Sequence, residues 1–235
     1  MAAEICPVME PMQTAYSITG QVEELKDQIQ TAGCRKMVLV GHSWGAMLAV
    51  LFAHSYQDMV KKLILVGCPP LLADYVPMIK DRRDRNLAPD ERQELKQLTA
   101  LLESGGAGEL EKDRILGRLE ILADKGDSVD PADKSGLELQ YPVVLDGAQY
   151  AAVWNEAADL RARGEFLKRT AALTCPVTLI HGRQDPHPPE GITEPLEGCG
   201  LQLQVYLLDS CGHTPWQESR AKEAFFSILK QELLN

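Results

Sequence analysis

The first regular hydrophobic pattern of the chain has the period of a helix. From residue 18 onward, apolar side chains recur at intervals of four, three and four residues and form one stripe. The stripe consists of Ile18, Val22, Leu25 and Ile29. Ser17 or Thr19 can cap the start of this helix, and Gly33 can end it. We therefore expect a helix that begins near residue 18 and ends before residue 33.

Four later runs are apolar with little alternation, which is typical of parallel strands covered on both faces. They span residues 36–40, 61–66, 176–181 and 201–208. In the last run, Gln202 and Gln204 indicate one partly solvated face. A small-residue run of helical character separates the first two strands, so they are predicted to form a right-handed βαβ unit. Residues 218–234 form a second amphipathic pattern and predict a closing helix.

The pattern changes between residues 69 and 172, where charged residues cluster and leucine recurs at helical spacing. Helices are predicted from residue 88, over residues 110–122 and over residues 149–163. Residues 104–106 are predicted to stop the first of these helices, and residues 126–136 to form a polar loop. No convincing strand pattern occurs in this stretch. The sequence therefore predicts an all-helical lid inserted between two parallel strands.

Composition and charge narrow the class of protein. The chain has 235 residues, enough for one domain with an insertion, and its net charge is −10. The acidic balance argues against nucleic acid and against anionic membrane surfaces as partners. No apolar stretch is long enough to span a membrane, and residues 1–11 lack the pattern of a signal peptide. The six cysteines form no C-x-x-C pair, so we expect reduced thiols in a cytoplasmic protein.

The motif with the clearest chemistry follows the first strand. Residues 41–45 read Gly-His-Ser-Trp-Gly and connect that strand to a helix of small residues. Strand, sharp turn and helix are the context of a nucleophile elbow, which exposes a strained serine. Glycine is expected at both flanks because a Cβ at either position would collide with neighbouring backbone. Ser43 is therefore the candidate nucleophile, and the backbone N–H of Trp44 is the candidate oxyanion donor.

Two loops after later strands supply the candidate acid and base. Residues 182–188 contain Asp185, and residues 209–216 contain His213. Sites in an open parallel sheet form outside the carboxyl ends of the strands, so these side chains and Ser43 are expected to meet. A serine hydroxyl is a weak nucleophile until a base takes its proton, and His213 would be that base. Asp185 would accept a hydrogen bond from the other ring nitrogen of His213 and orient it.

Other residues compete for some of these roles. Asp209 is a rival for the acid, although its closeness to His213 along the chain disfavours it. His187 is interpreted as a residue of a rigid loop, and His42 as a packing and hydrogen-bonding residue of the elbow. Aromatic residues that could line a pocket, but are more often plain core, are Tyr150, Trp154 and Trp216.

Three motifs resemble signatures of the α/β-hydrolase superfamily. They are Gly-His-Ser-Trp-Gly at residues 41–45, His-Gly-x-x-Asp at 181–185 and Cys-Gly-His at 211–213. The Gly-x-Ser-Trp-Gly form and the helical insertion resemble the proline-iminopeptidase-like and esterase-like branches. The resemblance covers roughly residues 18–69 and 173–234; in the insertion it extends only to position and helical character. It implies a mostly parallel sheet flanked by helices, with a core of residues 1–68 and 173–235 and a lid of residues 69–172.

One departure from the family pattern concerns the start of the chain. The family normally has four further strands before the nucleophile strand, and a His-Gly-type loop among them completes the oxyanion hole. Only about 35 residues precede the first predicted strand here, and they contain no such motif. We therefore expect a sheet shortened on its N-terminal side and leave the second oxyanion donor unassigned. Either the chain is a shortened form of a longer parent, or residues 7–16 fold over the gap.

These features predict a serine hydrolase, without metal or cofactor, that acts on a small ester, amide or related acyl substrate. One alternative is a catalytically weak or inactive ligand-binding protein of the same fold. Another is a lyase or carbon–carbon hydrolase that uses the same triad. Since the first strand would form an uncovered apolar edge, which tends to pair with another chain, a homodimer is also expected.

Overall fold

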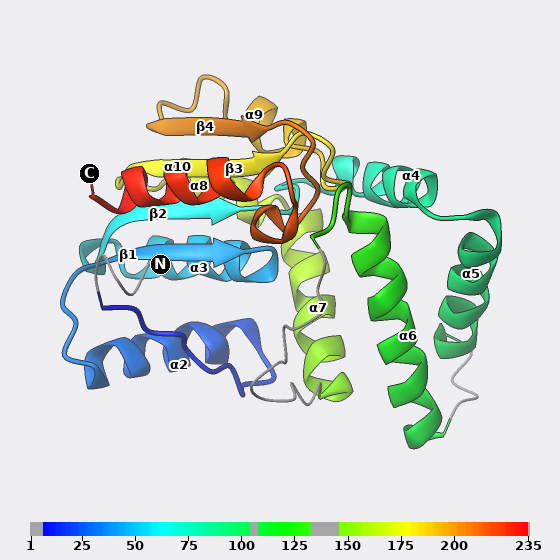
Figure 1. Ribbon diagram of the computed structural model, residues 1–235. Helices are drawn as coiled ribbons and strands as arrows, with labels where there is room; N and C mark the ends of the chain where they lie inside the picture. The colour runs from blue at the N-terminus through cyan, green and yellow to red at the C-terminus, as the bar shows by residue number, and fades with distance from the viewer. Residues whose placement is uncertain (1–6, 104–107, 133–145, 235) are drawn as a thin grey trace.

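A computed structural model describes residues 7–103, 108–132 and 146–234 of the protein. In this part of the chain, one sheet contains four parallel strands whose order in space follows their order in the sequence (Figure 1). The strands are β1 (Met37–His42), β2 (Val60–Val66), β3 (Val177–Gly182) and β4 (Leu203–Leu208). All four agree with the predicted strands to within three residues at each end. The prediction of an α/β-type parallel sheet is confirmed.

The inner strands of the sheet are more completely covered than its edge strands. Every residue of β3 is buried between its neighbours and the flanking helices. β1 forms one edge, and Val40 in it keeps 49% of its surface exposed. Across the sheet, Val40 lies opposite Ile64 of β2, which is fully buried. In the described residues, β1 thus has a strand partner on one side only and an apolar residue open to solvent.

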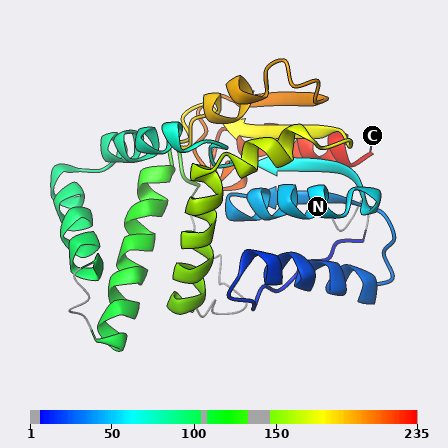
Figure 2. The ribbon, with the colours of Figure 1, turned by 180° about the vertical axis from the view of Figure 1, so that it is seen from behind.

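Helices cover both faces of the sheet, as Figures 1 and 2 show from opposite sides. One face carries α2 (Ile18–Thr31), α3 (Trp44–Ser55), α8 (Glu165–Ala171) and α9 (Glu190–Leu196). The core on this face includes the fully buried Phe52 and Phe166. The opposite face is covered by α10 (Lys222–Leu234), whose Phe225 packs with Ile180 of β3. The site described below lies at the carboxyl ends of the strands of this three-layer core.

The first helix begins and ends where the sequence predicts. The hydroxyl of Ser17 accepts a hydrogen bond from the Gly20 N–H (3.1 Å), which caps α2. Gly33, just beyond its end, has a φ of 74°, a left-handed conformation that glycine adopts without strain. The closing helix differs from its prediction, because α10 begins four residues later than residue 218. Glu218 itself is fully buried and serves another purpose, described below.

Helices between β2 and β3 extend beyond the carboxyl ends of the first two strands (Figure 1). They are α4 (Val76–Asn86), α5 (Pro89–Glu103), α6 (Glu109–Asp127) and α7 (Gly147–Ala162). The predicted start at Pro89 is confirmed, whereas α6 continues to Asp127, into the range predicted as a polar loop. The predicted stop at residues 104–106 lies outside the described residues, as does the part of the predicted loop after residue 132. No helix of the described chain is long and apolar enough to cross a bilayer.

Three helices have no counterpart in the sequence-based prediction. The helix α4 has no buried residue, so it carries no apolar stripe for a periodicity argument to find. α8 and α9 have seven residues each, too few for a clear period. α8 packs against α3 on the face of the sheet, with Phe166 in the main core, although its sequence lies in the range predicted for the insertion. Short 3-10 helices are η1 (Gln57–Met59), η2 (Ala73–Tyr75) and η3 (Pro215–Gln217).

The segment before α2 connects a core helix to an insertion helix. The N–H of Thr14 donates to a carboxylate oxygen of Glu24 in α2 (2.9 Å). The side-chain amide of Gln149, at the start of α7, donates to the carbonyls of Gln13 (3.0 Å) and Ala15 (3.2 Å). The described part of this segment therefore ties α2 to α7 and adds no strand to the sheet beside β1.

Five of the six cysteines lie in the described residues, and all five are free thiols. Burial raises the pKa of Cys68 and of Cys211 to about 12, so both remain protonated. Cys34 and Cys199, in contrast, are exposed. The thiols at 68 and 211 behave as small apolar groups of the core.

Candidate active site

Ser43 occupies a strained turn between β1 and α3. Its φ of 52° and ψ of −121° are unusual for a residue with a side chain, and such conformations cost roughly 1–3 kcal/mol. The Ser43 N–H donates to the Val66 carbonyl (3.1 Å), and the Ser43 carbonyl accepts from the Ala46 N–H (3.0 Å) at the start of α3. The surrounding backbone therefore holds the serine in the geometry that a nucleophile elbow requires.

The two glycines of the elbow do not have equal steric roles. A Cβ built on Gly41 would lie 2.3 Å from the carbonyl oxygen of Gly45, so the turn admits no side chain at position 41. A Cβ built on Gly45 would meet nothing within 4 Å. The expectation of a steric clash is correct for Gly41 and wrong for Gly45, because the first turn of α3 points that position into open space.

Trp44 is the first residue of α3, at a position where a backbone N–H has no partner within its own helix. Its indole Nε1 donates to the side-chain oxygen of Gln21 in α2 (3.0 Å). Among the described residues, neither the Trp44 N–H nor the Ser43 hydroxyl makes a hydrogen bond. Both groups at this end of β1 are free to contact a substrate.

The loops after β3 and β4 bring Asp185 and His213 together. The Nδ1 of His213 lies 2.8 Å from Oδ2 of Asp185, and both side chains are buried. The loops approach so closely that a Cβ on Gly182 would lie 2.1 Å from the Gly212 oxygen. The Gln184 N–H also donates to the Cys211 carbonyl (3.0 Å). Glycine at position 182 is therefore a condition for this pair to form.

The electrostatics of the pair favour an ionised acid and a basic imidazole. Burial raises the pKa of Asp185, but the charges of His181 and His213 and the hydrogen bonds from His187 and His213 hold it well below its usual value. Burial lowers the pKa of His213, but the charge and hydrogen bond of Asp185 outweigh burial and leave it raised. The carboxylate thus fixes the Nδ1–H tautomer of His213 and leaves Nε2 as the basic nitrogen.

Two further histidines surround the same carboxylate. The backbone N–H of His187 donates to Oδ1 of Asp185 (2.8 Å), and its ring Nδ1 lies 3.0 Å from that oxygen. The His187 ring also stacks on His213, with centroids 4.2 Å apart. His181 places Nε2 3.2 Å from Oδ2 of Asp185 and 2.8 Å from the His187 carbonyl oxygen. His187 thus contacts both acid and base, a role that its interpretation as a rigid-loop residue missed; its position two residues after Asp185 is the only signal in the sequence.

His42 places the nucleophile strand against the base loop. Its Nε2 lies 3.0 Å from the carbonyl oxygen of His213, and its ring packs edge-on against Trp216. Burial and the nearby His213 lower the pKa of His42 to about 4, so it stays neutral near neutral pH. Gly67 closes the other side, because a Cβ there would lie 3.0 Å from Nδ1 of His213. Ser43, which follows His42, therefore lies on the backbone segment next to His213.

Glu218 binds the insertion to the base loop. Its fully buried carboxylate accepts hydrogen bonds from the N–H groups of Val129 (3.0 Å), Asp130 (2.5 Å) and Gly212 (3.0 Å). Nearby, the N–H of His213 donates to the carbonyl of Asp127 at the end of α6 (2.8 Å). The end of α6 is thereby fixed beside the candidate base. The sequence placed Glu218 at the start of an amphipathic helix and missed this role.

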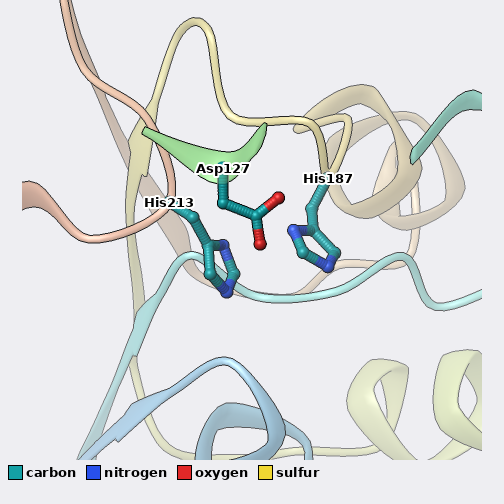
Figure 3. A group of neighbouring side chains, drawn as sticks. All are labelled: Asp127, His187 and His213. Atoms are coloured by element: carbon teal, nitrogen blue, oxygen red, sulfur yellow. The ribbon is translucent and has the colours of Figure 1, made fainter. Parts of the chain in front are cut away.

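A partly buried ion pair lies on the insertion side of His213. Arg83 of α4 donates Nε and Nη2 to the two carboxylate oxygens of Asp127 (2.5 and 2.6 Å). Asp127, His187 and His213 each offer one potential metal ligand within 4.8 Å of the others (Figure 3). These residue types suit a transition metal. In the structure, however, Arg83 occupies both oxygens of Asp127, and the Nδ1 of each histidine faces Asp185.

The rival acid, Asp209, points elsewhere. Its carboxylate accepts a hydrogen bond from Nε of Arg183 (2.6 Å), and 83% of its side chain is exposed. The structure thus brings Asp185, and not Asp209, against His213. Ser43 directly follows His42, whose ring contacts the His213 carbonyl, but among the described residues no hydrogen bond joins the Ser43 hydroxyl to His213. Catalytic hydrogen bonds are often long before substrate binds, so this geometry is compatible with the predicted roles.

Comparison with known proteins agrees with this architecture. Over 57 residues the chain is 39% identical to Epoxide hydrolase 4 of Mus musculus, a stretch that covers 24% of this chain and 16% of that protein. Over 221 residues it is 26% identical to Monoacylglycerol lipase abhd6-B of Xenopus laevis, which covers 89% of this chain and 59% of that protein. The chain therefore spans less than two thirds of the length of these curated relatives.

Solved structures share the fold at low sequence identity. The crystal structure of VinJ superposes with a TM-score of 0.62 at 17% identity, covering 93% of this chain and 73% of that one. Proline iminopeptidase of Mycobacterium smegmatis gives a TM-score of 0.58 at 17% identity, covering 93% and 72%. The family model described as alpha/beta hydrolase fold matches residues 5–216. The chain therefore belongs to the α/β-hydrolase fold family.

Proposed function

We propose that this protein is a serine hydrolase that cleaves a small ester, amide or related acyl substrate. The observation that carries the proposal is the buried 2.8 Å contact between Asp185 and His213, formed beside a serine in strained elbow geometry. Acid, base and nucleophile come from three different strand ends, in the chain order that this family uses. The relatives named as an epoxide hydrolase and a monoacylglycerol lipase support a hydrolytic reaction, and the lipase supports an ester substrate.

In the proposed acylation step, Nε2 of His213 takes the proton of the Ser43 hydroxyl while Oγ bonds to the substrate carbonyl carbon. The N–H of Trp44 would hydrogen-bond the resulting oxyanion. Collapse of the tetrahedral intermediate breaks the bond to the leaving group, which receives the proton from His213. Water then attacks the acyl-serine in the same way, and the acid product and free Ser43 are released. Asp185 stays ionised throughout and stabilises the imidazolium of His213.

The oxyanion site has one assigned donor. That donor is the backbone N–H of Trp44, the first residue of α3. Helices α4–α7 would act as a lid over the substrate, and the free thiols fit a reducing compartment such as the cytoplasm.

A fluorophosphonate probe tests the proposal directly, because it bonds to an activated serine oxygen and releases fluoride. Wild type should be labelled, and Ser43→Ala should not. Ser55→Ala is the matched control, because Ser55 lies at the other end of α3 and its hydroxyl donates to the Leu51 carbonyl (3.0 Å). Labelling that is absent in wild type, or retained in Ser43→Ala, would overturn the proposal.

A second candidate is a weakly active or inactive ligand-binding protein of the same fold, and the single assigned oxyanion donor is the observation that favours it. A panel of p-nitrophenyl esters separates the two functions. A hydrolase should turn over at least one ester, with activity lost in Ser43→Ala. A binding protein should bind esters without release of p-nitrophenol. A lyase or carbon–carbon hydrolase would show labelling of Ser43 without ester turnover.

A further inference from the structure

Two aromatic residues of the insertion are exposed on the same side of α7. Tyr150 keeps 53% of its surface exposed and Trp154 keeps 42%. The two are four residues apart, so they are neighbours on the helix, and their rings stack with centroids 5.6 Å apart and planes inclined by 11°. The packed side of α7 is formed by other residues, namely Val153, Ala157 and Leu160. The two rings therefore do not belong to the hydrophobic core, in which aromatic side chains more often lie.

This pair continues to the residue after the candidate nucleophile. The Trp154 ring meets Trp44 at an angle of 61°, with centroids 6.4 Å apart, an edge-to-face contact. The Trp44 indole is fixed by its hydrogen bond to Gln21. Trp44, Trp154 and Tyr150 thus form a continuous series of three rings, which we call the aromatic ladder. Its first ring belongs to the residue bonded to Ser43.

The far end of the ladder lies within electrostatic range of charges in two other helices of the insertion. Burial raises the pKa of the Tyr150 hydroxyl, and the charges of Arg83 in α4 and Glu120 in α6 act on it in opposite directions. Arg83 binds Asp127, which lies beside His187 and His213 (Figure 3). The ladder therefore begins at the residue bonded to Ser43 and continues along the exposed side of α7.

We propose that the aromatic ladder binds a planar aromatic group of the substrate and makes the enzyme selective for aromatic acyl compounds. The inference rests on the proposed serine hydrolase function and names its substrate class. Aromatic rings attract one another in offset-stacked or edge-to-face arrangements, beyond the gain from burying apolar area. A saturated ring of similar size gains the buried area but lacks the π face. The ladder therefore distinguishes a flat ring from a saturated one.

The test compares methyl benzoate with methyl cyclohexanecarboxylate, followed by methanol release. In the wild type, kcat/KM for methyl benzoate should exceed kcat/KM for methyl cyclohexanecarboxylate by roughly two- to tenfold. This ratio is taken after division by the ratio of the two rates of alkaline hydrolysis, which corrects for the intrinsic reactivity of the esters. Trp154→Leu, which keeps apolar bulk without a π face, should remove this preference. Trp154→Phe, which keeps a ring, should retain most of it. Tyr150→Leu and Tyr150→Phe form a second matched pair at the other exposed ring.

A binding measurement separates failure of the ladder from failure of the catalytic proposal. Two of the three tryptophans belong to the ladder, so their fluorescence should respond to benzamide and much less to cyclohexanecarboxamide. Trp154→Leu should abolish the difference. Benzamide binding without fluorophosphonate labelling would leave the ladder standing and overturn the hydrolase. The proposal for the ladder would be overturned if flat and saturated rings gave the same kcat/KM and the same fluorescence response. It would also be overturned if Trp154→Leu and Tyr150→Leu both left the preference for the flat ring unchanged.

Discussion

The acid–base half of the candidate site and its nucleophile half are held in place in very different ways. Asp185 and His213 lie in loops after β3 and β4, and three histidine rings and the backbone N–H of His187 surround the Asp185 carboxylate. Ser43 and Trp44 lie at the end of β1, the edge strand, and among the described residues their free polar groups have no partner. One half is a closed hydrogen-bond network, and the other is open.

The difference shows which parts of a catalytic site a protein core can hold by itself. A buried carboxylate must be fully hydrogen-bonded, since an unsatisfied charge would cost several kcal/mol, so the acid–base half forms with or without substrate. Under the proposed function, the nucleophile half has to leave its hydroxyl and N–H unsatisfied, because substrate would bind there. Strain in the backbone of Ser43 replaces side-chain bonds as the means of positioning.

The strongest test of the closed half is Asp185→Asn. An amide has almost the shape of the carboxylate, but its NH₂ can impose the wrong tautomer on His213. We expect kcat to fall by about 10⁴ with the fold intact, measured on any ester that the wild type hydrolyses. Asp209→Asn is the control and should have little effect, since Asp209 faces solvent. A comparable loss in Asp209→Asn would contradict the assignment of the acid.

Glu218→Gln tests the hydrogen bonds that connect the insertion to the loop of His213. The amide keeps the volume but loses the negative charge that accepts three backbone N–H groups, and its NH₂ would face those donors. We expect the free energy of unfolding to fall by about 1–3 kcal/mol, measured by urea titration. Glu223→Gln, on the exposed side of α10, should change it by less than about 0.5 kcal/mol. Equal stabilities of the two variants would show that the buried carboxylate does not hold the insertion.

The pH dependence of labelling sharpens the electrostatic side of the comparison. His213 must be neutral to act as a base, and its pKa is raised above 6.5 by Asp185. The rate of fluorophosphonate labelling should therefore increase with pH through a midpoint above 6.5 and level off at higher pH. Burial lowers the pKa of both His187 and His42. We therefore expect only one titration step, that of His213, in the plot of labelling rate against pH above 6.5. A midpoint below 6.5 would mean that Asp185 does not govern His213.

The smallest effect concerns the open edge of the sheet. We propose that the exposed apolar edge at β1 pairs with a second copy of the chain. Val40→Lys places a charge on this edge and should shift a dimer to monomer in light scattering, with a change in stability within about 0.5 kcal/mol. Ile121→Lys, on an exposed position of α6 that is 59% accessible, is the control and should leave the assembly unchanged. A monomeric wild type would contradict the pairing.

Local patterns made much of the fold predictable. The strands were predictable because each is a short apolar run. The capping Ser17 and the terminal Gly33 indicated the two ends of α2, because these signals lie within a few residues of the helix. Three helices were not predicted. α4 has no buried apolar stripe, and α8 and α9, with seven residues each, are too short to show a clear helical period. Gly45 was given a steric role that only the direction of α3 could decide.

What the sequence determined by itself was the elbow at Ser43 and the order of the candidate nucleophile, acid and base along three strand ends. Parallel strands place their carboxyl ends at one edge, so order and spacing were enough. What tertiary structure decided were the contacts that join distant segments. Arg83 meets Asp127 across 44 residues, and Glu218 binds Val129 across 89. Such pairs leave no period or motif in the chain, because neither partner's role exists until the other segment packs beside it.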